Sequence, residues 1–370
     1  MGFTNSMKIP YVDLSYKHKS KKELISIFRK VLNKGQFVGG EEIDLFEKNI
    51  AKLCGTNYAV ALNSGTDALT LALHLLGVRR GDEVITTPNS FIASTAVIVH
   101  LGAKPVFVDV LNDQNIDPTK IQNAITKKTK AIMPVHLSGR MSQMDKIMSI
   151  AQKNKLLVVE DAAQSVGSKY KNKMSGSFGD IGCFSAHPLK NLNALGDAGY
   201  LTTNNFINYK KIKSLSNHGM EKRNVIKNFG YVSRMDNLQA AFLNYRLKNL
   251  DKVINKRRKN ASIYIKELDR RFVFFNNETK KEFNTYHTFV VQVNFRNQLR
   301  KHLLNKGIET SIHYPIPIHL QPAAKFLGYK KGDFLNTETQ AQKILTLPIS
   351  ENLSYSQIKY ICKCVNSFFK

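Results

Sequence analysis

The sequence predicts an α/β protein in which a large N-terminal domain holds a mostly parallel sheet covered by helices, followed by a smaller C-terminal α+β domain. Two observations predict this fold. Short apolar runs alternate with helix-like segments from Tyr58 to Thr203, and strands joined by helices form crossover connections between parallel neighbours. After Met235 the alternation stops and a long helical pattern begins. We expect an N-terminal arm and the large domain over 1–245, and the small domain over 246–370.

Seven segments of the large domain are predicted strands, and most of them are apolar throughout instead of alternating. This pattern is expected where helices cover both faces of a sheet. The predicted strands are Tyr58–Ala61, Glu83–Thr86, Pro105–Val108, Ala131–Val135, Leu156–Glu160, Gly182–Phe184 and Gly199–Thr202. Helix-like segments such as Thr66–Leu76 and Ser90–His100 lie between them. A seven-stranded sheet sandwiched by helices follows.

The C-terminal part has a different pattern. Apolar residues at helical spacing from Met235 to about Leu268 predict a long helix that can bridge the two domains. A strand from Thr288 to Val293, a helix from Gln298 to Lys306 and a final helix from Ser356 to Phe369 follow. No low-complexity linker separates the two units, so we expect the domains to pack firmly.

The net charge of +27 raises the alternative of a nucleic-acid-binding protein. The basic residues are mostly lysines scattered along the chain, and no helix-turn-helix, RNP or zinc-finger signature accompanies them. The densest early run, from Lys17 to Lys22, precedes a helix-like segment and is typical of a solvated helix start. We therefore expect no nucleic-acid partner, and a surface that can attract a diphosphate-bearing substrate.

Membrane, metal and export signals are not evident in the sequence. No apolar run is long enough to span a bilayer, and the first six residues lack the apolar block of a signal peptide. The four cysteines have neither CxxC nor zinc-site spacing, so we expect no metal site. Free thiols fit a reducing compartment. We expect a cytoplasmic protein without a membrane partner.

One lysine, Lys190, lies in a loop rich in Pro, Asn and Gly, directly after the apolar strand from Ile181 to Phe184. A lysine beside the end of a buried strand loses its proton on desolvation and becomes a nucleophile. Upstream, Asp161 follows another apolar strand. A Schiff-base lysine and a carboxylate for the ring nitrogen are the two protein groups that a pyridoxal phosphate site requires. The alternatives are a surface lysine and a helix cap.

A third motif follows the first predicted strand and opens a helix, with the sequence Asn63-Ser64-Gly65-Thr66-Asp67. The N-terminus of a helix offers free N–H groups and a partial positive charge, so it suits a phosphate group. Gly65 lets the backbone approach a ligand closely, and the flanking hydroxyls can donate hydrogen bonds. The alternative is an ordinary helix cap made by Ser64 or Thr66.

These motifs resemble those of the DegT/DnrJ/EryC1/StrS aminotransferases, which act on nucleotide-linked keto sugars and have the fold of type I pyridoxal phosphate enzymes. The resemblance covers nearly the whole chain, and its motifs occur in the same order and spacing. They lie at residues 35–40, 63–69, 81–84, 102–109, 160–164, 184–199, 233–241 and 313–322. The resemblance implies an enzyme with pyridoxal 5′-phosphate as its cofactor.

The resemblance also implies how the cofactor is bound. Lys190 is the catalytic residue: it holds the cofactor as a Schiff base, and its freed amine then moves the proton. Asp161 pairs with the ring nitrogen, Gln164 contacts the phenolic oxygen, and Phe91 stacks on the ring.

The phosphate of the cofactor is expected at Gly65 and Thr66, with Ser185 as a second hydroxyl contact. The family works as homodimers, and in many relatives an asparagine stands where this chain has Val232 and reaches the phosphate of the neighbouring subunit. Valine cannot donate that hydrogen bond, so Ser233 or Arg234 is the candidate replacement.

Three further residues are candidate substrate contacts. The segment from His313 to His319 resembles the substrate-side loop of the family, which nominates Tyr314 and His319. His187 occupies a position where many relatives carry an aromatic residue, and it is a candidate neighbour of the ring or the substrate. For His187 and His319 a packing role is the equal alternative.

The implied reaction moves an amino group from an amino-acid donor, glutamate in our expectation, to a keto sugar in a ping-pong cycle, for the synthesis of a surface polysaccharide such as lipopolysaccharide or another glycoconjugate. The sequence from Gly196 to Gly199 is similar to members that aminate the 3-keto position of a nucleotide-linked deoxysugar. A 4-keto nucleotide sugar and an eight-carbon keto-sugar acid are alternative substrates. Two other classes are a pyridoxal phosphate-dependent sugar dehydratase, against which Lys190 argues, and a non-catalytic binding protein.

Overall fold

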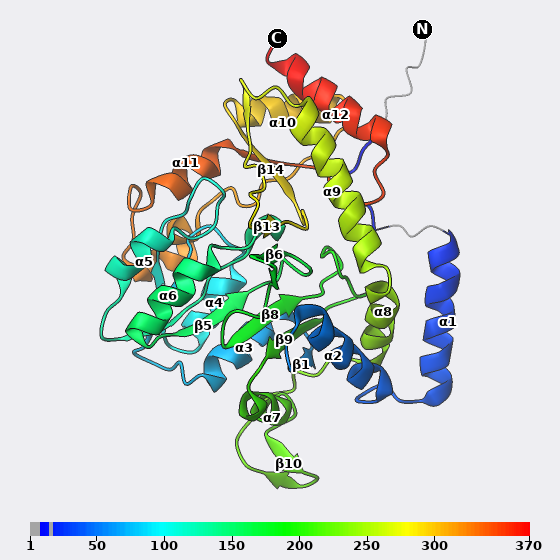
Figure 1. Ribbon diagram of the computed structural model, residues 1–370, viewed down its shortest axis with the longest axis vertical. Helices are drawn as coiled ribbons and strands as arrows, with labels where there is room; N and C mark the ends of the chain where they lie inside the picture. The colour runs from blue at the N-terminus through cyan, green and yellow to red at the C-terminus, as the bar shows by residue number, and fades with distance from the viewer. Residues whose placement is uncertain (1–7, 15–17) are drawn as a thin grey trace.

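The structure, a computed structural model, describes residues 8–14 and 18–370. Figure 1 shows a central sheet with helices around it, and a smaller unit of helices and strands above, where the C-terminus lies. The first six residues, from which we expect no signal peptide, lie outside the described ranges. Lys17 of the basic run lies outside them as well.

The central sheet has seven strands in the order β1–β9–β8–β5–β4–β2–β3. Only β9 runs antiparallel to its two neighbours, and every other pairing is parallel. The strands are β1 (Tyr58–Leu62), β2 (Glu83–Thr86), β3 (Lys104–Phe107), β4 (Thr129–Ile132), β5 (Leu157–Asp161), β8 (Ile181–Ser185) and β9 (Gly199–Thr203). The predicted fold class is confirmed, and the strand ends differ from the prediction by at most three residues.

Helices cover both faces of this sheet. Along β1, Val60 and Leu62 pack into a cluster with α3, whereas Ala59 and Ala61 pack into a second cluster with α2 and α8. Both kinds of position are therefore apolar, which explains why the strands do not alternate. The helices of this part are α1 (His18–Lys34), α2 (Glu41–Cys54), α3 (Gly65–Leu75), α4 (Ala93–His100), α5 (Pro118–Ala124), α6 (Met144–Asn154), α7 (Phe206–Leu215) and α8 (Asn237–Leu247).

Two small strand groups and three short turns of 3-10 helix complete this part. A three-stranded group has the order β13–β6–β7, and the hairpin of β10 and β11 projects at the bottom of Figure 1, below α7. Their bounds are β6 (Lys169–Tyr170), β7 (Lys173–Met174), β10 (Met220–Lys222), β11 (Val225–Ile226), β13 (Glu282–Phe283), η1 (Leu137–Gly139), η2 (Ile318–Leu320) and η3 (Pro322–Leu327).

The smaller unit has its own antiparallel sheet, in the order β12–β14–β15, and its own apolar core. Ile9 of the N-terminal arm is part of that core and bridges to Ile308, so the arm packs on the small unit. The division at residue 245 stays a prediction. The elements are α9 (Leu250–Glu267), β12 (Val273–Phe274), β14 (Phe289–Val293), α10 (Arg296–Asn305), α11 (Leu335–Lys343), β15 (Ile344–Leu347) and α12 (Tyr355–Phe368).

The long helix predicted from Met235 to Leu268 is two helices. The chain leaves the helical conformation at Asn249, with φ −114° and ψ 5°, between the end of α8 and the start of α9. Asparagine favours such breaks because its side chain competes for backbone hydrogen bonds. Apolar spacing continues across the break, which is why periodicity alone does not reveal it.

Within residues 8–14 and 18–370, no helix combines the length and the apolar character needed to cross a membrane. The same residues contain no group of three or more His, Cys, Asp and Glu side chains arranged to hold a metal ion.

A buried carboxylate fixes the middle of the sheet. Glu160 of β5 is fully buried and accepts backbone N–H groups of Gly176, Phe178 and Gly179 at 2.7–2.9 Å. It also accepts from Nε2 of His136 at 3.0 Å, since the other ring nitrogen of His136 accepts a backbone N–H. Burial alone raises the pKa of Glu160, but these hydrogen bonds outweigh it and the pKa is lowered.

We expect Glu160→Ala to destabilise the fold by about 3–5 kcal/mol, because it leaves several buried donors without an acceptor. The thermal unfolding midpoint and urea titration measure this change. Glu41→Ala, which removes an exposed ion pair with Lys34, is the matched control and should cost no more than about 0.5 kcal/mol.

The lowered pKa of Glu160 determines how its contribution to the free energy of unfolding changes with pH. Its contribution is fully present above the unfolded-state pKa of about 4.3 and is lost as the pH falls through the folded-state value. An equal loss of stability in Glu160→Ala and Glu41→Ala would contradict the stabilising role of Glu160.

Candidate active site

The ends of several strands meet at one edge of the sheet. Leu62 at the end of β1 lies opposite Gly199 at the start of β9, and Gly199 lies opposite Ser185 at the end of β8. Asp161 ends the neighbouring strand β5 and pairs with Cys183 of β8. The carboxyl ends of parallel strands are where open α/β sheets bind ligands.

Asp161 is a buried carboxylate that is not paired with a cation in a salt bridge among the described residues. It is 5% exposed. Ser94 donates to Oδ2 at 2.7 Å and the N–H of Ala163 to Oδ1 at 3.2 Å. Burial raises the pKa of Asp161, and these bonds together with the charge of Lys190 only partly oppose it. A protonated ring nitrogen would supply the missing cation.

Lys190 lies in the loop that follows β8, where its N–H donates to the carbonyl of His187 at 2.8 Å. The side chain is half-buried. Burial lowers its pKa to about 8, and the nearby Asp161 carboxylate opposes that shift. The amine is therefore partly unprotonated near neutral pH, as a nucleophile requires.

Gln164, Tyr314 and Phe91 form a further group of neighbouring side chains. The side chain of Gln164 accepts the N–H of Ser138 at 2.8 Å through Oε1, so its Nε2 faces the hydroxyl of Tyr314 at 3.4 Å. The rings of Phe91 and Tyr314 have centroids 6.1 Å apart. Phe91 is 56% exposed, so one of its faces is free to stack on a ligand.

The first turn of α3 forms a narrow cradle. A Cβ added at Gly65 would come within 2.7 Å of Cβ of Ser185, and one at Gly199 within 2.2 Å of the carbonyl carbon of Ser64. Ser64 makes the helix cap, accepting the N–H of Asp67 at 3.0 Å. Of the two residues that the sequence offers as the helix cap, Ser64 is the one that caps α3. Thr66 is exposed, and its hydroxyl is available to a ligand.

These features fit pyridoxal phosphate. The cradle at Gly65 and Thr66 accepts an anionic group at a helix N-terminus. Asp161 lacks the cation that the ring nitrogen provides, and Lys190 has the lowered pKa of a Schiff-base lysine. The structure thus brings the predicted cofactor residues to one edge of the sheet, and their individual contacts with the cofactor stay predictions.

The predicted substrate histidines have different surroundings. His319 is 2% exposed, its Nε2 lies 3.1 Å from Oε1 of Glu338, and its ring packs edge-on against Phe334. These contacts favour the packing alternative. His187 is exposed in the lysine loop, where its Nδ1 accepts the N–H of Leu189.

Ser233 and Arg234, the candidates for a contact with the neighbouring subunit, form hydrogen bonds within their own chain. Ser233 donates to the side chain of Asn63 at 3.1 Å, and Arg234 donates to the side chain of Asn217 at 2.8 Å. Val232, which directly precedes Ser233 in the chain, is exposed. A phosphate contact by Ser233 or Arg234 stays a prediction.

Sequence reasoning missed Ser94 and two histidines. Burial lowers the pKa of His313 to about 4 and that of His287 well below its usual value, and Lys190 adds to both shifts. Both therefore lie near Lys190 and are neutral. A signal for Ser94 was its place in an apolar segment three residues after Phe91, whereas nothing local marks His287.

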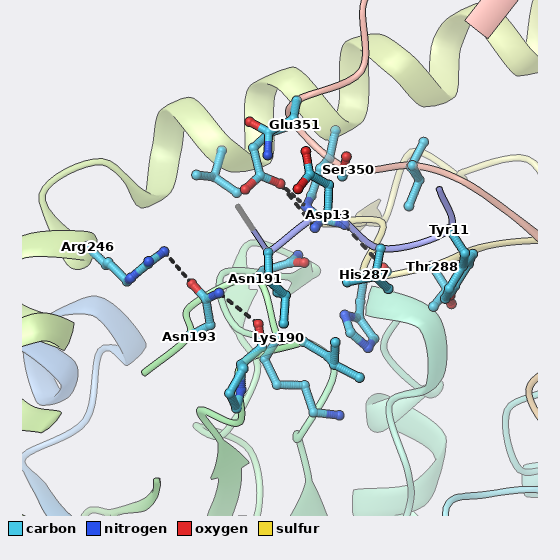
Figure 2. A pocket seen from close by; sticks show the side chains of 18 of the residues that line it. Tyr11, Asp13, Lys190, Asn191, Asn193, Arg246, His287, Thr288, Ser350 and Glu351 are labelled. Atoms are coloured by element: carbon cyan, nitrogen blue, oxygen red, sulfur yellow. Dashed lines mark hydrogen bonds and ion pairs between the residues drawn. The ribbon is translucent and has the colours of Figure 1, made fainter. Parts of the chain in front are cut away.

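A cavity of about 460 Å³ opens between Lys190 and the small unit. Figure 2 shows Lys190 and His287 below, with Tyr11 and Asp13 of the N-terminal arm above them. Polar side chains dominate the residues labelled there, which suits a polar substrate.

The sequence profile of the DegT/DnrJ/EryC1/StrS aminotransferase family matches residues 18–366. The dTDP-3-amino-3,6-dideoxy-alpha-D-galactopyranose transaminase of Aneurinibacillus thermoaerophilus is 38% identical over 364 residues, which are 97% of this chain and 99% of the relative.

Solved structures agree with this match. DesV of S. venezuelae in complex with a ketimine intermediate superimposes with a TM-score of 0.95 at 34% identity, covering 98% of each chain. NtdA of Bacillus subtilis with bound cofactor PMP gives a TM-score of 0.90 at 31% identity, covering 97% of this chain and 85% of that one.

The predicted resemblance, enzyme class and cofactor are thereby confirmed. The protein is a sugar aminotransferase dependent on pyridoxal 5′-phosphate, with the fold of the type I enzymes. With a profile match over nearly all of its length and the lysine, carboxylate and phosphate cradle at one edge of its sheet, the chain belongs to the DegT/DnrJ/EryC1/StrS aminotransferase family.

Proposed function

We propose that the protein transfers the amino group of glutamate to a nucleotide-linked 3-keto-deoxysugar, for the synthesis of a surface polysaccharide or glycoconjugate. The observation that carries the transaminase chemistry is the pair of Lys190, with its lowered pKa, and the buried Asp161 without a cation. The relative named for a 3-amino-dideoxysugar supports the sugar position. A 4-keto nucleotide sugar and an eight-carbon keto-sugar acid are the alternatives that the substrate panel below separates.

Each residue of the site has a separate role in the proposed reaction. When bound, pyridoxal phosphate supplies an aldehyde that captures amines and an electron-poor ring that stabilises negative charge. The negative charge of Asp161 would keep the nitrogen of the cofactor ring protonated. Lys190 Nζ, unprotonated in part near neutral pH, takes and returns the proton of the substrate carbon. The aromatic rings of Phe91 and Tyr314, with centroids 6.1 Å apart, offer apolar faces for the cofactor ring.

The competing enzyme class is a sugar dehydratase. Members of this fold that deoxygenate sugars replace the lysine by histidine, whereas this chain keeps Lys190. Glutamate should therefore convert the bound cofactor to its amine form, with 2-oxoglutarate as product. An unchanged cofactor spectrum after glutamate would favour the dehydratase.

A cytoplasmic homodimer is part of the proposal. Apolar side chains are exposed on the outer side of α1, at Ile25, Phe28 and Leu32, and on the segment after β11, where Phe229 is 99% exposed. In Figure 1, α1 lies at the right edge of the molecule, on the far side of α8 from the sheet, and it contacts α8. Exposed apolar surface of this kind marks a protein interface, and a second copy of the chain would bury it.

We expect Lys190→Ala to abolish transamination and the visible absorbance of the covalently held cofactor, because it removes the amine that forms the Schiff base. Absorbance spectra and a coupled 2-oxoglutarate assay measure this. Circular dichroism is the control for folding. Activity and absorbance like those of the wild type would refute the assignment.

Asp161→Asn should lower kcat at least about 100-fold, which is about 2.7 kcal/mol of transition-state stabilisation. The amide keeps the size of the side chain but cannot hold the proton on the ring nitrogen. Asp161→Glu, which keeps the charge, is the matched variant and should lose less. Equal losses in the two variants would mean that geometry, and not charge, explains the role of Asp161.

The substrate assignment is tested by incubating purified protein and glutamate with a panel of keto sugars and detecting amino sugars by mass spectrometry. We expect the product from a nucleotide-linked 3-keto-deoxysugar. Product only from a 4-keto sugar or an eight-carbon keto-sugar acid would select the corresponding alternative.

We expect the wild type to be a dimer at micromolar concentration by light scattering, and Phe229→Asp to shift it toward monomer by placing a charge in the interface. Phe326→Asp, at another exposed phenylalanine, is the control and should leave the mass unchanged. A wild type that is monomeric at every concentration would disprove the homodimer.

A further inference from the structure

The loop that carries Lys190 is closed by backbone bonds at its base. The N–H of Ala186 donates to the carbonyl of Ala198, and the N–H of Ala194 donates to the carbonyl of Ala186, both at 2.8 Å. Between these points the chain makes the turn at His187–Lys190. Backbone bonds thus fix the two ends of the loop and close the turn at Lys190, and side chains tie that turn to the rest of the fold.

Asn193 closes the loop across Lys190. Its Nδ2 donates to the carbonyl of Pro188 at 2.7 Å, two residues before the lysine, while its Oδ1 accepts from Nη1 of Arg246 at 2.6 Å. Figure 2 shows both bonds in line, from Arg246 through Asn193 to the lysine loop. The Arg246 bond fixes which side of the amide faces Pro188, because a guanidinium can only donate.

Arg246 is held in the last turn of α8, a helix packed into the core of the large domain through residues such as Leu243. On the other side of the lysine, Asn191 donates to the carbonyl of Thr285 at 3.1 Å, just before β14 of the small unit. The lysine is therefore flanked by two asparagines that bond to different parts of the fold.

We propose that Arg246 is a positioning residue that acts through Asn193 to hold the turn bearing Lys190 in its reactive place. Arg246 bonds to Asn193 and not to the lysine, so its effect is geometric. This inference rests on the proposed function of Lys190, and it assigns a role to a residue outside the cofactor motifs.

The physical consequence concerns both placement and hydration. A displacement of about 1 Å at a reacting group can cost about 100-fold in rate. A looser turn also admits water to Lys190, and a hydrated amine regains its ordinary pKa. Arginine suits the relay because its planar fork loses less freedom per hydrogen bond than a lysine side chain does.

The test uses Arg246→Met, which keeps the aliphatic stem and removes the donors, and Arg246→Lys, which restores one donor. Cofactor-free protein is briefly acetylated over a range of pH, and the modified peptide containing residue 190 is quantified by mass spectrometry. The wild type should be half-labelled near pH 8, the pKa to which burial lowers Lys190. Arg246→Met should move this midpoint up by about one unit and lower kcat about 10- to 100-fold, with partial rescue in Arg246→Lys.

Two further variants keep the test decisive. Arg300→Met removes an exposed arginine of α10 and should change neither the midpoint nor kcat. Asn193→Leu keeps the size but breaks the relay, and should shift the midpoint in the same direction as Arg246→Met. The double variant should lose no more than the larger single loss, since both residues act through one link.

A labelling midpoint and kcat in Arg246→Met like those of the wild type would overturn the inference. So would a variant that is only less heat-stable, with both of those quantities unchanged. Failure of the proposed function has a different signature: the wild type itself would then form no covalent link between the cofactor and Lys190.

Discussion

A buried carboxylate that forms no ion pair with any residue the structure describes is the constraint on which this site depends. Asp161 ends the central strand β5, it is almost fully buried, and its two hydrogen bonds come from neutral donors. An isolated buried carboxylate is costly, and in proteins it is either paired or protonated. The raised pKa of Asp161 is the sign of that cost, and a cofactor ring that brings a proton and a charge removes it. Lys190 responds to the same field, which raises its pKa while burial lowers it.

The preceding residue shows the contrast. Glu160 is as deeply buried as Asp161, but its oxygens accept four hydrogen bonds, and its pKa is lowered. Neighbours in a strand point to opposite faces, so one carboxylate is satisfied by the fold and the other is left for a ligand. Two acidic residues in one strand thus have different tasks because of their hydrogen-bond partners and not because of their chemistry.

Much of the fold could be predicted because strands buried on both faces leave a strong apolar signal. All seven strands of the central sheet were predicted, as were β14, α10 and α12. The break at Asn249 was not, because apolar spacing continues through it. Strand β15 was missed because three apolar residues and a threonine directly after a helix do not distinguish a strand from a helix end. For the site, Lys190, Asp161 and the cradle at Gly65 carry local sequence signals.

Other parts of the site depend on contacts that are distant in sequence. The link from Ser94 to Asp161, the shifts of the two histidines near Lys190, and the relay from Arg246 need the folded chain. The packing of His319 against Phe334 is of the same kind. Such relations join residues that no local pattern relates.

The most direct measurement is borohydride reduction of the cofactor-saturated enzyme followed by proteolysis and mass spectrometry. The account predicts one phosphopyridoxyl group per chain, on the peptide that contains residue 190. A label on any other lysine, or none after saturation with cofactor, would contradict it.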